Sequence, residues 1–363
     1  MNRPFPKSTC NFKEEPEAEA LDINTGPIET TEIKNAIQSL ANNKAGGEDE
    51  ITPEMLKAMD ETNLGTLKIL FNKVWEEEKV PEQWRNGIIV KIPKKGDLSD
   101  CNNWRGITLL SVVSKVFTKI MLSRIRDAVD SKLREEQAGF RPGRSCTDQI
   151  FVLRIILEEY MEKQKALHMN FIDFKKAFDS LHRDSLWQIM KLYGIPAKII
   201  TITESLYKNN RCTVRTEEGL SDWFQVETGV KQGCIMSPLL FGIAVDFIMR
   251  KCTKEQTGIL WTDGKQLEDL DFADDIALLS DTSEKMQKKT TKLAEIAEKV
   301  GLQISHEKTK VMKNAICSNN SIQLGEQRIE EVTQFTYLGS CIDHNGELKK
   351  RDSNKNSKSS HSI

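Results

Sequence analysis

The stretch that most constrains the fold is L-D-F-A-D-D-I-A-L-L, the ten residues from Leu270 to Leu279. Apolar residues flank the adjacent carboxylates of Asp274 and Asp275, and turn-forming residues lie just outside. An apolar run this short, bounded by turn signals, predicts a strand, a tight bend and a second strand. Two like charges at a hairpin tip disfavour joint ionisation, and a divalent cation with oxygen ligands, Mg²⁺ or Mn²⁺, is the usual compensation. A solvated turn rich in aspartate is the alternative that this stretch alone leaves open.

The composition narrows the class of protein. At 363 residues, 38% hydrophobic and 29% charged, the chain is long enough for two or three domains of an ordinary globular protein. No apolar run approaches the length of a membrane span, and the N-terminus lacks a secretory signal, so no membrane partner is expected. Eight cysteines without a C-x-x-C pair indicate neither a zinc site nor a disulfide framework. Reduced thiols indicate an intracellular protein, with nucleus or cytoplasm left open.

Charge is distributed unevenly along the chain. The net charge is −2, but residues 1–84 carry 9 basic against 17 acidic side chains, whereas residues 85–144 carry 13 basic against 6 acidic ones. The second block, with a balance of +7, is large enough to serve as an electrostatic footprint for a polyphosphate. A solvated helix face is the simpler explanation when charge is considered alone.

The order of predicted elements indicates the fold class. From His168 the pattern alternates between strands and helices, which suits an α+β fold: an antiparallel sheet of the ferredoxin-like, split βαβ type with helices on one face. Residues 1–30 read as a flexible lead-in, and residues 346–363 as a disordered polar tail.

A second carboxylate segment offers a partner for the hairpin. The stretch H-M-N-F-I-D-F, residues 168–174, reads as a strand with Asp173 near its end. Asp173, Asp274 and Asp275 could together hold two Mg²⁺ ions roughly 3.5–4 Å apart, an arrangement suited to in-line phosphoryl transfer. The alternative for Asp173 is a helix N-cap, because Lys175, Lys176 and Ala177 follow it.

Eight motifs are spread along the chain. Five lie in its second half: F-I-D-F-K-K-A-F-D (171–179), Q-G-C-I-M-S-P-L-L-F (232–241), F-A-D-D-I-A-L-L (272–279), G-L-Q-I-S-H-E-K-T-K (301–310) and F-T-Y-L-G (335–339). Three lie upstream: N-K-A-G-G-E-D-E-I-T-P (43–53), I-P-K-K-G-D-L-S-D-C-N-N-W-R-G-I-T-L-L (92–110) and Q-A-G-F-R-P-G-R-S-C-T-D-Q-I (137–150). The five resemble, in order, the successive motifs of reverse transcriptases of LINE-type (non-long-terminal-repeat) retrotransposons, and the three resemble the N-terminal extension and fingers of that group. The resemblance covers about residues 33–342.

This resemblance implies a right-hand polymerase with fingers and palm. Residues 31–165 would form the N-terminal extension and fingers, and residues 166–345 the palm, with a fingers insertion at about 195–230. The implied activity is RNA-directed DNA polymerisation by two Mg²⁺ ions, with an RNA template, a DNA primer and dNTPs as partners and no obligate protein partner.

The resemblance also assigns catalytic roles by position. Asp173 and Asp274 match the two main metal ligands, and Asp275 the supporting one. Lys308 is the candidate acid that protonates the leaving pyrophosphate, with Lys310 as an equal rival.

Further positions match the family's substrate contacts. Phe178 would exclude the sugar 2′-hydroxyl and so favour dNTPs. Gln232 and Gly233 resemble the turn that contacts the incoming nucleotide and template. Lys91 and Arg105 are candidates for the triphosphate, and Lys94 or Lys95 could replace Lys91. The primer's 3′ end would be gripped by the hairpin of Tyr337, Leu338 and Gly339.

The chain also departs from the family pattern. No endonuclease precedes residue 30, and only 22 residues follow Cys341 where the family continues with a helical thumb. We therefore expect a fragment with its thumb largely missing, whose activity by itself is in doubt. One rival interpretation is a catalytically silent nucleic-acid-binding remnant of the same fold. A second is a metal-dependent phosphohydrolase that uses the same aspartates.

Overall fold

The computed structural model describes residues 19–94, 96–317 and 320–345, so the predicted tail and most of the predicted lead-in lie outside the described residues. The chain divides into two compact units. Of the described residues, the first comprises Leu133–His182 and those from Phe241 to residue 345, and the second comprises residues 19–132 together with Arg183–Leu240. The described part of the chain therefore passes from one unit to the other three times. Across the described residues we find no helix with the length and apolarity that crossing a membrane requires.

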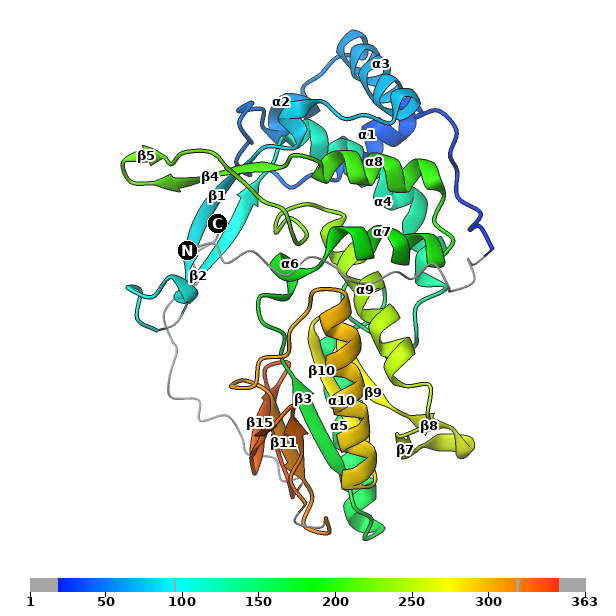
Figure 1. Cartoon of the computed structure of the whole chain (residues 1–363). Coiled ribbons are helices and arrows are strands. Elements are labelled where there is room, and N and C mark those ends of the chain that lie inside the picture. The colour runs from blue at the N-terminus through cyan, green and yellow to red at the C-terminus, as the bar shows by residue number, and fades with distance from the viewer. Residues whose placement is uncertain (1–18, 95, 318–319, 346–363) are drawn as a thin grey trace. The chain divides into compact units, whose positions relative to one another are not determined.

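The first unit is built on a five-stranded sheet with the strand order β14-β11-β3-β10-β9 (Figure 1). Its strands are β3 (His168–Ile172), β9 (Asp269–Phe272), β10 (Asp275–Ser280), β11 (Lys310–Lys313) and β14 (Glu330–Glu331). All neighbouring strands pair antiparallel except β11 and β14, which pair in parallel. The predicted α+β class with an antiparallel sheet is confirmed.

Helices cover both faces of this sheet, not one face as predicted. Met169 and Phe171 of β3 pack in one apolar cluster with Leu153 and Leu157 of α5 (Cys146–Glu162). Asn170 lies between these two residues in β3, and its side-chain amide donates a hydrogen bond to the Thr290 hydroxyl of α10 (Ser283–Lys299). Successive strand residues point to opposite faces, so α5 and α10 lie on opposite sides. The reason is that every residue of β3 is buried, on both faces, so both faces must be covered.

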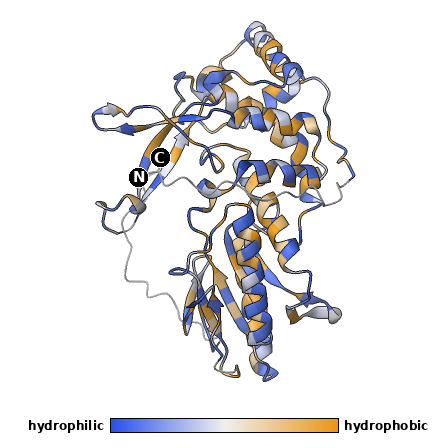
Figure 2. Cartoon of the chain, in the orientation of Figure 1, coloured by the Kyte–Doolittle hydropathy of each residue, from blue (hydrophilic) through white to orange (hydrophobic). Residues whose placement is uncertain are grey.

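The remaining elements of the first unit are short, apart from one long helix. That helix, α9 (Ser237–Cys252), belongs to this unit from Phe241 onward, is apolar over most of its length and shows the hydrophobic colour in Figure 2. The short elements are α6 (Ala177–Ser180), β7 (Ile259–Leu260), the 3₁₀ turn Thr262–Gly264, β8 (Gln266–Leu267), β12 (Gln323–Leu324), β13 (Gln327–Arg328), β15 (Gln334–Tyr337) and β16 (Ser340–Asp343).

The second unit joins six helices to a second sheet. The helices are α1 (Thr30–Gln38), α2 (Pro53–Lys57), α3 (Glu61–Glu77), α4 (Val112–Asp130), α7 (Arg183–Leu192) and α8 (Ala197–Tyr207). The strands are β1 (Gly87–Pro93), β2 (Trp104–Leu109), β4 (Arg211–Thr216), β5 (Gly219–Leu220) and β6 (Phe224–Gln225), with 3₁₀ turns at Glu82–Trp84 and Cys101–Asn103. β1 pairs antiparallel with β2 and parallel with β4. An aromatic cluster of Phe71, Trp75, Trp84 and Phe117 ties α3 to α4.

Packing also decides where the segment before β3 belongs. The sequence pattern groups residues 133–165 with the residues before them, but they pack in the first unit. Helix α5 buries Leu153, Ile156 and Tyr160 in the cluster under the β3–β10 pair. The assignment of residues 31–165 to the N-terminal extension and fingers and of residues 166–345 to the palm remains a prediction. Fingers and palm are defined by their contacts with nucleic acid, which the structure does not contain.

Candidate active site

The three aspartates lie together where β3 ends and β10 begins, at one end of the central strands of the first unit's sheet; we call this place the carboxylate edge. Ile172 of β3 pairs with Ile276 of β10 in antiparallel register, so one step further along the strands Asp173 stands opposite Asp275. Opposed residues of an antiparallel pair lie roughly 5 Å apart at Cα. Asp275 also pairs with Phe272, which leaves Ala273 and Asp274 as the two turn residues between β9 and β10. The predicted strand, bend and strand are thus present.

Electrostatics at this edge disfavour three free negative charges. The removal of solvent by surrounding protein atoms, followed by the charges of Asp274 and Asp173, raises the pKa of Asp275 to about 6. The Asp275 side chain nevertheless remains exposed, so water screens part of this repulsion. The positive charge of Lys308 lowers the pKa of Asp275 and so favours its ionised form. The site therefore attracts positive charge.

Lys308 and Lys310, equal rivals by sequence, have different partners. Lys308 Nζ lies 3.3 Å from Asp173 Oδ1 and its side chain is 67% exposed, so it can move. Lys310 Nζ pairs with Glu330 Oε2 at 2.8 Å, and its side chain is 18% exposed. Lys308 is the lysine at the carboxylate edge.

The donor set at this edge suits a hard divalent cation. Carboxylate oxygens of Asp173, Asp274 and Asp275 are the ligands that Mg²⁺ or Mn²⁺ prefers. Burial is the main cause of the raised pKa of Asp275, and the charges of Asp274 and Asp173, which a cation would offset, add to it. Within residues 19–94, 96–317 and 320–345, no three His, Cys, Asp or Glu side chains converge closely enough to hold an ion as they stand. The aspartates would have to turn toward the metal, which their position at a strand end and in a turn allows.

Phe178 lies in an aromatic row beside the metal edge. It follows Asp173 by five residues in α6, and its ring stacks on Phe241 of α9 with centroids 4.5 Å apart. On its other side Phe140 approaches edge-on at 6.2 Å. The Phe178 side chain is half-buried, so it is fixed by its neighbours and still presents a surface. A ring that is held in place and partly exposed can form a rigid wall of a binding site.

The hairpin predicted to grip a primer is present, but its tyrosine points inward. β15 and β16 are joined by Leu338 and Gly339, both with positive φ (48° and 85°), as a two-residue type I′ turn requires. Tyr337 is 2% exposed and donates a hydrogen bond to the Leu270 carbonyl at 2.9 Å. Tyr337 therefore anchors the hairpin to β9, while exposed Gly339 can present its backbone to a ligand.

In the second unit, Gln232 and Gly233 lie against strand β2. The Gln232 carbonyl accepts a hydrogen bond from the Thr108 amide at 2.7 Å. Gly233 has φ +127°, and a Cβ there would stand 2.2 Å from the Thr108 carbonyl oxygen. Only glycine fits this close approach. The turn of Gln232 and Gly233 is therefore packed directly against β2, the strand that carries Arg105.

The two triphosphate candidates lie on opposite faces of the β1–β2 hairpin. Lys91 pairs with Gly106, and Arg105 pairs with Ile92, so alternation directs the two side chains away from one another. Lys91 instead lies over the Trp104 ring at 5.2 Å. The pairing of β1 with β2 continues beyond Pro93, because the Lys94 amide donates a hydrogen bond to the Asn103 carbonyl. Lys94 is two residues after Ile92, the partner of Arg105, so alternation places Lys94 on the same face as Arg105. The other alternative, Lys95, lies outside the described residues.

The sequence interpretation missed two buried polar residues next to the predicted site. Lys231 precedes Gln232, is 8% exposed and donates to the carbonyls of Arg85 and Leu206 at 3.1 Å each. Burial lowers its pKa to about 8. Gln137 is completely buried and contacts the Asp274–Asp275 turn. Gln137 opens one of the recognised motifs, which was the signal available; nothing in the sequence marks Lys231 as buried.

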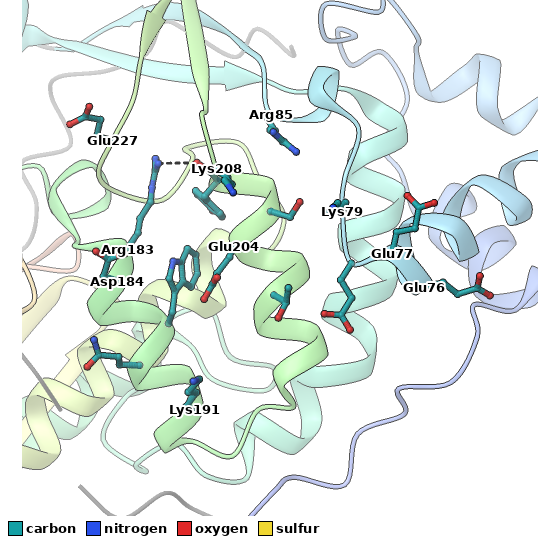
Figure 3. Close-up of a pocket in the computed structure, with 16 residues that line it drawn as sticks. Glu76, Glu77, Lys79, Arg85, Arg183, Asp184, Lys191, Glu204, Lys208 and Glu227 are labelled. Carbon is teal, nitrogen blue, oxygen red and sulfur yellow. Dashed lines mark hydrogen bonds between the residues drawn. The ribbon is translucent and has the colours of Figure 1, made fainter. Parts of the chain in front are cut away.

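A separate groove of about 900 Å³ lies in the second unit and contains none of the predicted residues (Figure 3). Basic and acidic side chains line it together, and the hydrogen-bonding capacity of one of them, Arg183, is used internally. Its guanidinium donates to the carbonyls of Tyr207, Val226, Thr228 and Gly229. The groove wall is therefore held by internal hydrogen bonds.

Comparison with known proteins agrees with the geometry. The R2 retrotransposon polyprotein of Nasonia vitripennis is 26% identical over 335 residues, which cover 89% of this chain and 32% of that protein. The RNA-directed DNA polymerase of the Drosophila melanogaster mobile element jockey is 25% identical over 93% of this chain and 38% of that protein. The probable polymerase of the Drosophila X-element is 31% identical over 61% of this chain and 25% of that protein. The chain thus spans about a third or less of the length of these relatives.

Solved structures agree in fold. Apo telomerase of Candida tropicalis, truncated from its C-terminal domain, superposes with a TM-score of 0.53 at 20% identity, covering 75% of this chain and 56% of that one. The family model described as reverse transcriptase (RNA-dependent DNA polymerase) matches residues 92–342, the span that holds the carboxylate edge and the glycine turn. The chain belongs to the reverse transcriptase family.

Proposed function

We propose that this chain is an RNA-directed DNA polymerase core that transfers a nucleotidyl group from a dNTP to a primer 3′-hydroxyl. The observation that carries the proposal is the strand register, in which Asp173 stands opposite Asp275 with Asp274 in the adjoining turn. Family membership supports it. The relatives are longer than this chain, so the activity is proposed for this chain and not transferred from them.

Asp173, Asp274 and Asp275 would hold two Mg²⁺ ions, or Mn²⁺ in their place. When bound, such a pair lowers the barrier to displacement at phosphorus by stabilising negative charge on the attacking and leaving oxygens. The protein's part is to supply three carboxylates at one edge, where their mutual repulsion favours cation binding. Asp173 and Asp275 are contributed by neighbouring strands, which fixes their spacing.

In the reaction, the primer 3′-oxygen forms a bond to the α-phosphorus and loses its proton, while the bond to the β-phosphate oxygen breaks and pyrophosphate leaves. Lys308 is the residue we propose to donate a proton to the leaving pyrophosphate. Its support is its position at Asp173 and its freedom to move. Phe178 would exclude a 2′-hydroxyl because its ring is wedged between Phe140 and Phe241.

The proposed partners are an RNA template, a DNA primer and dNTPs, without an obligate protein partner. Arg105, with Lys94 on the same strand face, is the proposed triphosphate contact, and Gln232 with Gly233 the proposed contact to nucleotide and template. Leu338 and Gly339 would touch the primer end. An intracellular location is also proposed, supported by free thiols at all seven cysteines in the described part of the chain.

A primer-extension assay tests this proposal. The full chain is given a DNA primer annealed to an RNA template, dNTPs and Mg²⁺, beside Asp274→Asn and the matched control Glu298→Gln, an exposed carboxylate on α10. We expect extension by the wild type and the control, and a loss of about a thousandfold or more in Asp274→Asn, because a metal ligand is removed.

Two outcomes would contradict the proposal. If the wild type binds the RNA–DNA duplex but extends no primer, and Asp274→Asn behaves identically, the chain is a silent binding module. Release of inorganic phosphate from dNTPs without any primer, lost in Asp274→Asn, would instead indicate a phosphohydrolase.

A further inference from the structure

The side chain of Gln137 is hydrogen-bonded to the turn that carries the two adjacent aspartates. Its Oε1 accepts from the Ala273 amide at 2.9 Å and from the Gly139 amide at 2.7 Å, and its Nε2 donates to the Ala273 carbonyl at 3.4 Å. The amide of Gln137 thus pairs with both peptide groups of Ala273 in the manner of a neighbouring strand. Gln137 is 0% exposed, so water cannot replace these bonds.

Ala273 needs such support because of its backbone conformation. Its φ is +60°, in the left-handed region that residues other than glycine seldom occupy. This conformation is unfavourable for an L-residue with a Cβ, which comes too close to the following carbonyl oxygen. Ala273 immediately precedes Asp274, so its φ and ψ set the direction in which both carboxylates leave the turn. Partners that hold Ala273 in this conformation also orient the aspartates.

The segment that contributes Gln137 is itself firmly held. The Ala138 amide donates to the Asp271 carbonyl at 2.8 Å, and the Asp271 amide donates to the Glu136 carbonyl at 3.1 Å, so this segment runs beside β9. A Cβ on Gly139 would stand 2.1 Å from the Ala273 nitrogen, which shows how closely the segment follows the turn.

Buried ion pairs anchor the start of this segment. Arg134 donates to Asp269 at 2.9 Å and to Asp271 at 2.6 Å, and its own amide donates to Asp246 at 2.8 Å. All three carboxylates are completely buried. Gln137 therefore lies three residues after Arg134, whose ion pairs fix it to β9, the strand that leads into the turn.

We propose that Gln137 is a positioning residue that holds Asp274 and Asp275 in the geometry needed for catalysis by fixing the conformation of Ala273. It contacts no substrate and acts only through the turn. This inference rests on the proposed function, because it assumes that the two aspartates hold metal. Its distinctive consequence is that loss of Gln137 weakens the response to Mg²⁺ in addition to any effect on overall stability.

The test compares two buried glutamines of the same unit. Gln137→Met keeps the side chain's length and removes every bond to the turn. Gln149→Met is the matched control, since Gln149 is 7% exposed and donates to the Glu136 carbonyl at 3.0 Å, away from the turn. We expect Gln137→Met to lower kcat about tenfold or more and to raise the half-saturating Mg²⁺ concentration several-fold. The control should change either value by less than about twofold.

Hydrogen–deuterium exchange gives a readout that does not depend on activity. Amides of residues 270–276 should exchange faster in Gln137→Met than in the wild type and the control, because the turn opens more often. Gln137→Asn keeps a neutral amide but is one methylene shorter, so its bonds to Ala273 lengthen and exchange at the turn should also rise; it serves if Gln137→Met fails to fold.

Unchanged exchange at the turn in both Gln137 variants, or equal effects of Gln137→Met and Gln149→Met on the Mg²⁺ response, would overturn the inference. If the wild type shows no polymerase activity, the proposed function fails, while the exchange comparison still decides whether Gln137 holds the turn.

Discussion

Asp275 is the residue whose charge depends most on its neighbours at the candidate site. Its pKa of about 6 lies above the value of an unperturbed aspartate, so the folded protein binds this proton more tightly than the unfolded chain does. The charged form destabilises the fold above pH 6. That penalty declines as the pH falls through 6 and disappears below the unfolded pKa near about 4.

From this we expect Asp275→Asn to unfold at a higher temperature than the wild type at pH 7.5, by a few degrees at most because the side chain is exposed. At pH 4 the two melting temperatures should converge, since the wild-type carboxyl is then protonated. Thermal unfolding followed by circular dichroism checks this, with Glu298→Gln as the surface control. A difference that persists or grows at pH 4 contradicts the proposed origin of the shift.

At Phe178 the predicted property is sugar discrimination. Phe178→Val should raise the ratio of kcat/KM for rNTPs to that for dNTPs by about tenfold or more, because the ring no longer blocks the 2′-hydroxyl. Steady-state incorporation with each nucleotide class measures the ratio. The control is Phe151→Val, since Phe151 is 62% exposed on α5. A Phe178 variant that loses both activities in the same proportion would show that the ring is only a packing element.

At the scale of elements, local chemistry was enough to predict the hairpin of β9 and β10. The hairpin follows from an apolar run with carboxylates at its bend. Helix α8 shows where local chemistry is insufficient, because its Ile199-Ile200-Thr201-Ile202-Thr203 run is β-branched and by propensity favours a strand. Tertiary packing decides there: Ile199, Ile200 and Ile202 are all buried.

What the sequence could not provide was the orientation of side chains on those elements. Whether Lys91 shares a face with Arg105 depends on the register of β1 on β2, and whether Tyr337 points outward depends on the packing of β15 on β9. A period of two residues makes orientation sensitive to a single step of register. Similarly, the choice between Lys308 and Lys310 required the position of Glu330.

The strand β9 leads to a prediction about stability. Arg134→Met should lower the free energy of unfolding by roughly 3–5 kcal/mol, because Asp269 and Asp271 would remain buried without their cation. The control Arg144→Met breaks a pair with Glu135 that is largely exposed and should cost less than about 1 kcal/mol. Urea unfolding measures both. Equal losses would show that burial of the ion pairs is not what makes Arg134 important.

For the whole molecule, a net charge of −2 conceals a divided distribution. Part of the basic block at residues 85–144 is used internally, because Arg124 is paired with Glu32 and Arg134 with buried aspartates. Exposed cations such as Lys91 and Arg105 remain for a polyanion. The number of phosphates contacted should therefore be well below the 13 basic residues of the block.

We therefore expect affinity for an RNA–DNA duplex to fall about 150-fold between roughly 50 and 200 mM salt, as about four phosphate contacts would give. Binding titrations at several salt concentrations measure the slope, with Arg105→Gln expected to reduce it by about one contact. Affinity that does not respond to salt would exclude phosphate contacts as the main source of binding.

The three passages of the chain between its two units have a consequence for biosynthesis. A ribosome delivers residues 19–132 first, but the unit to which they belong is completed only when residue 240 has emerged. Until then the surfaces that α7 and α8 will cover stay open to water and to other nascent chains. No single cut releases either unit as one continuous piece, and interruption of translation before residue 240 leaves both unfinished.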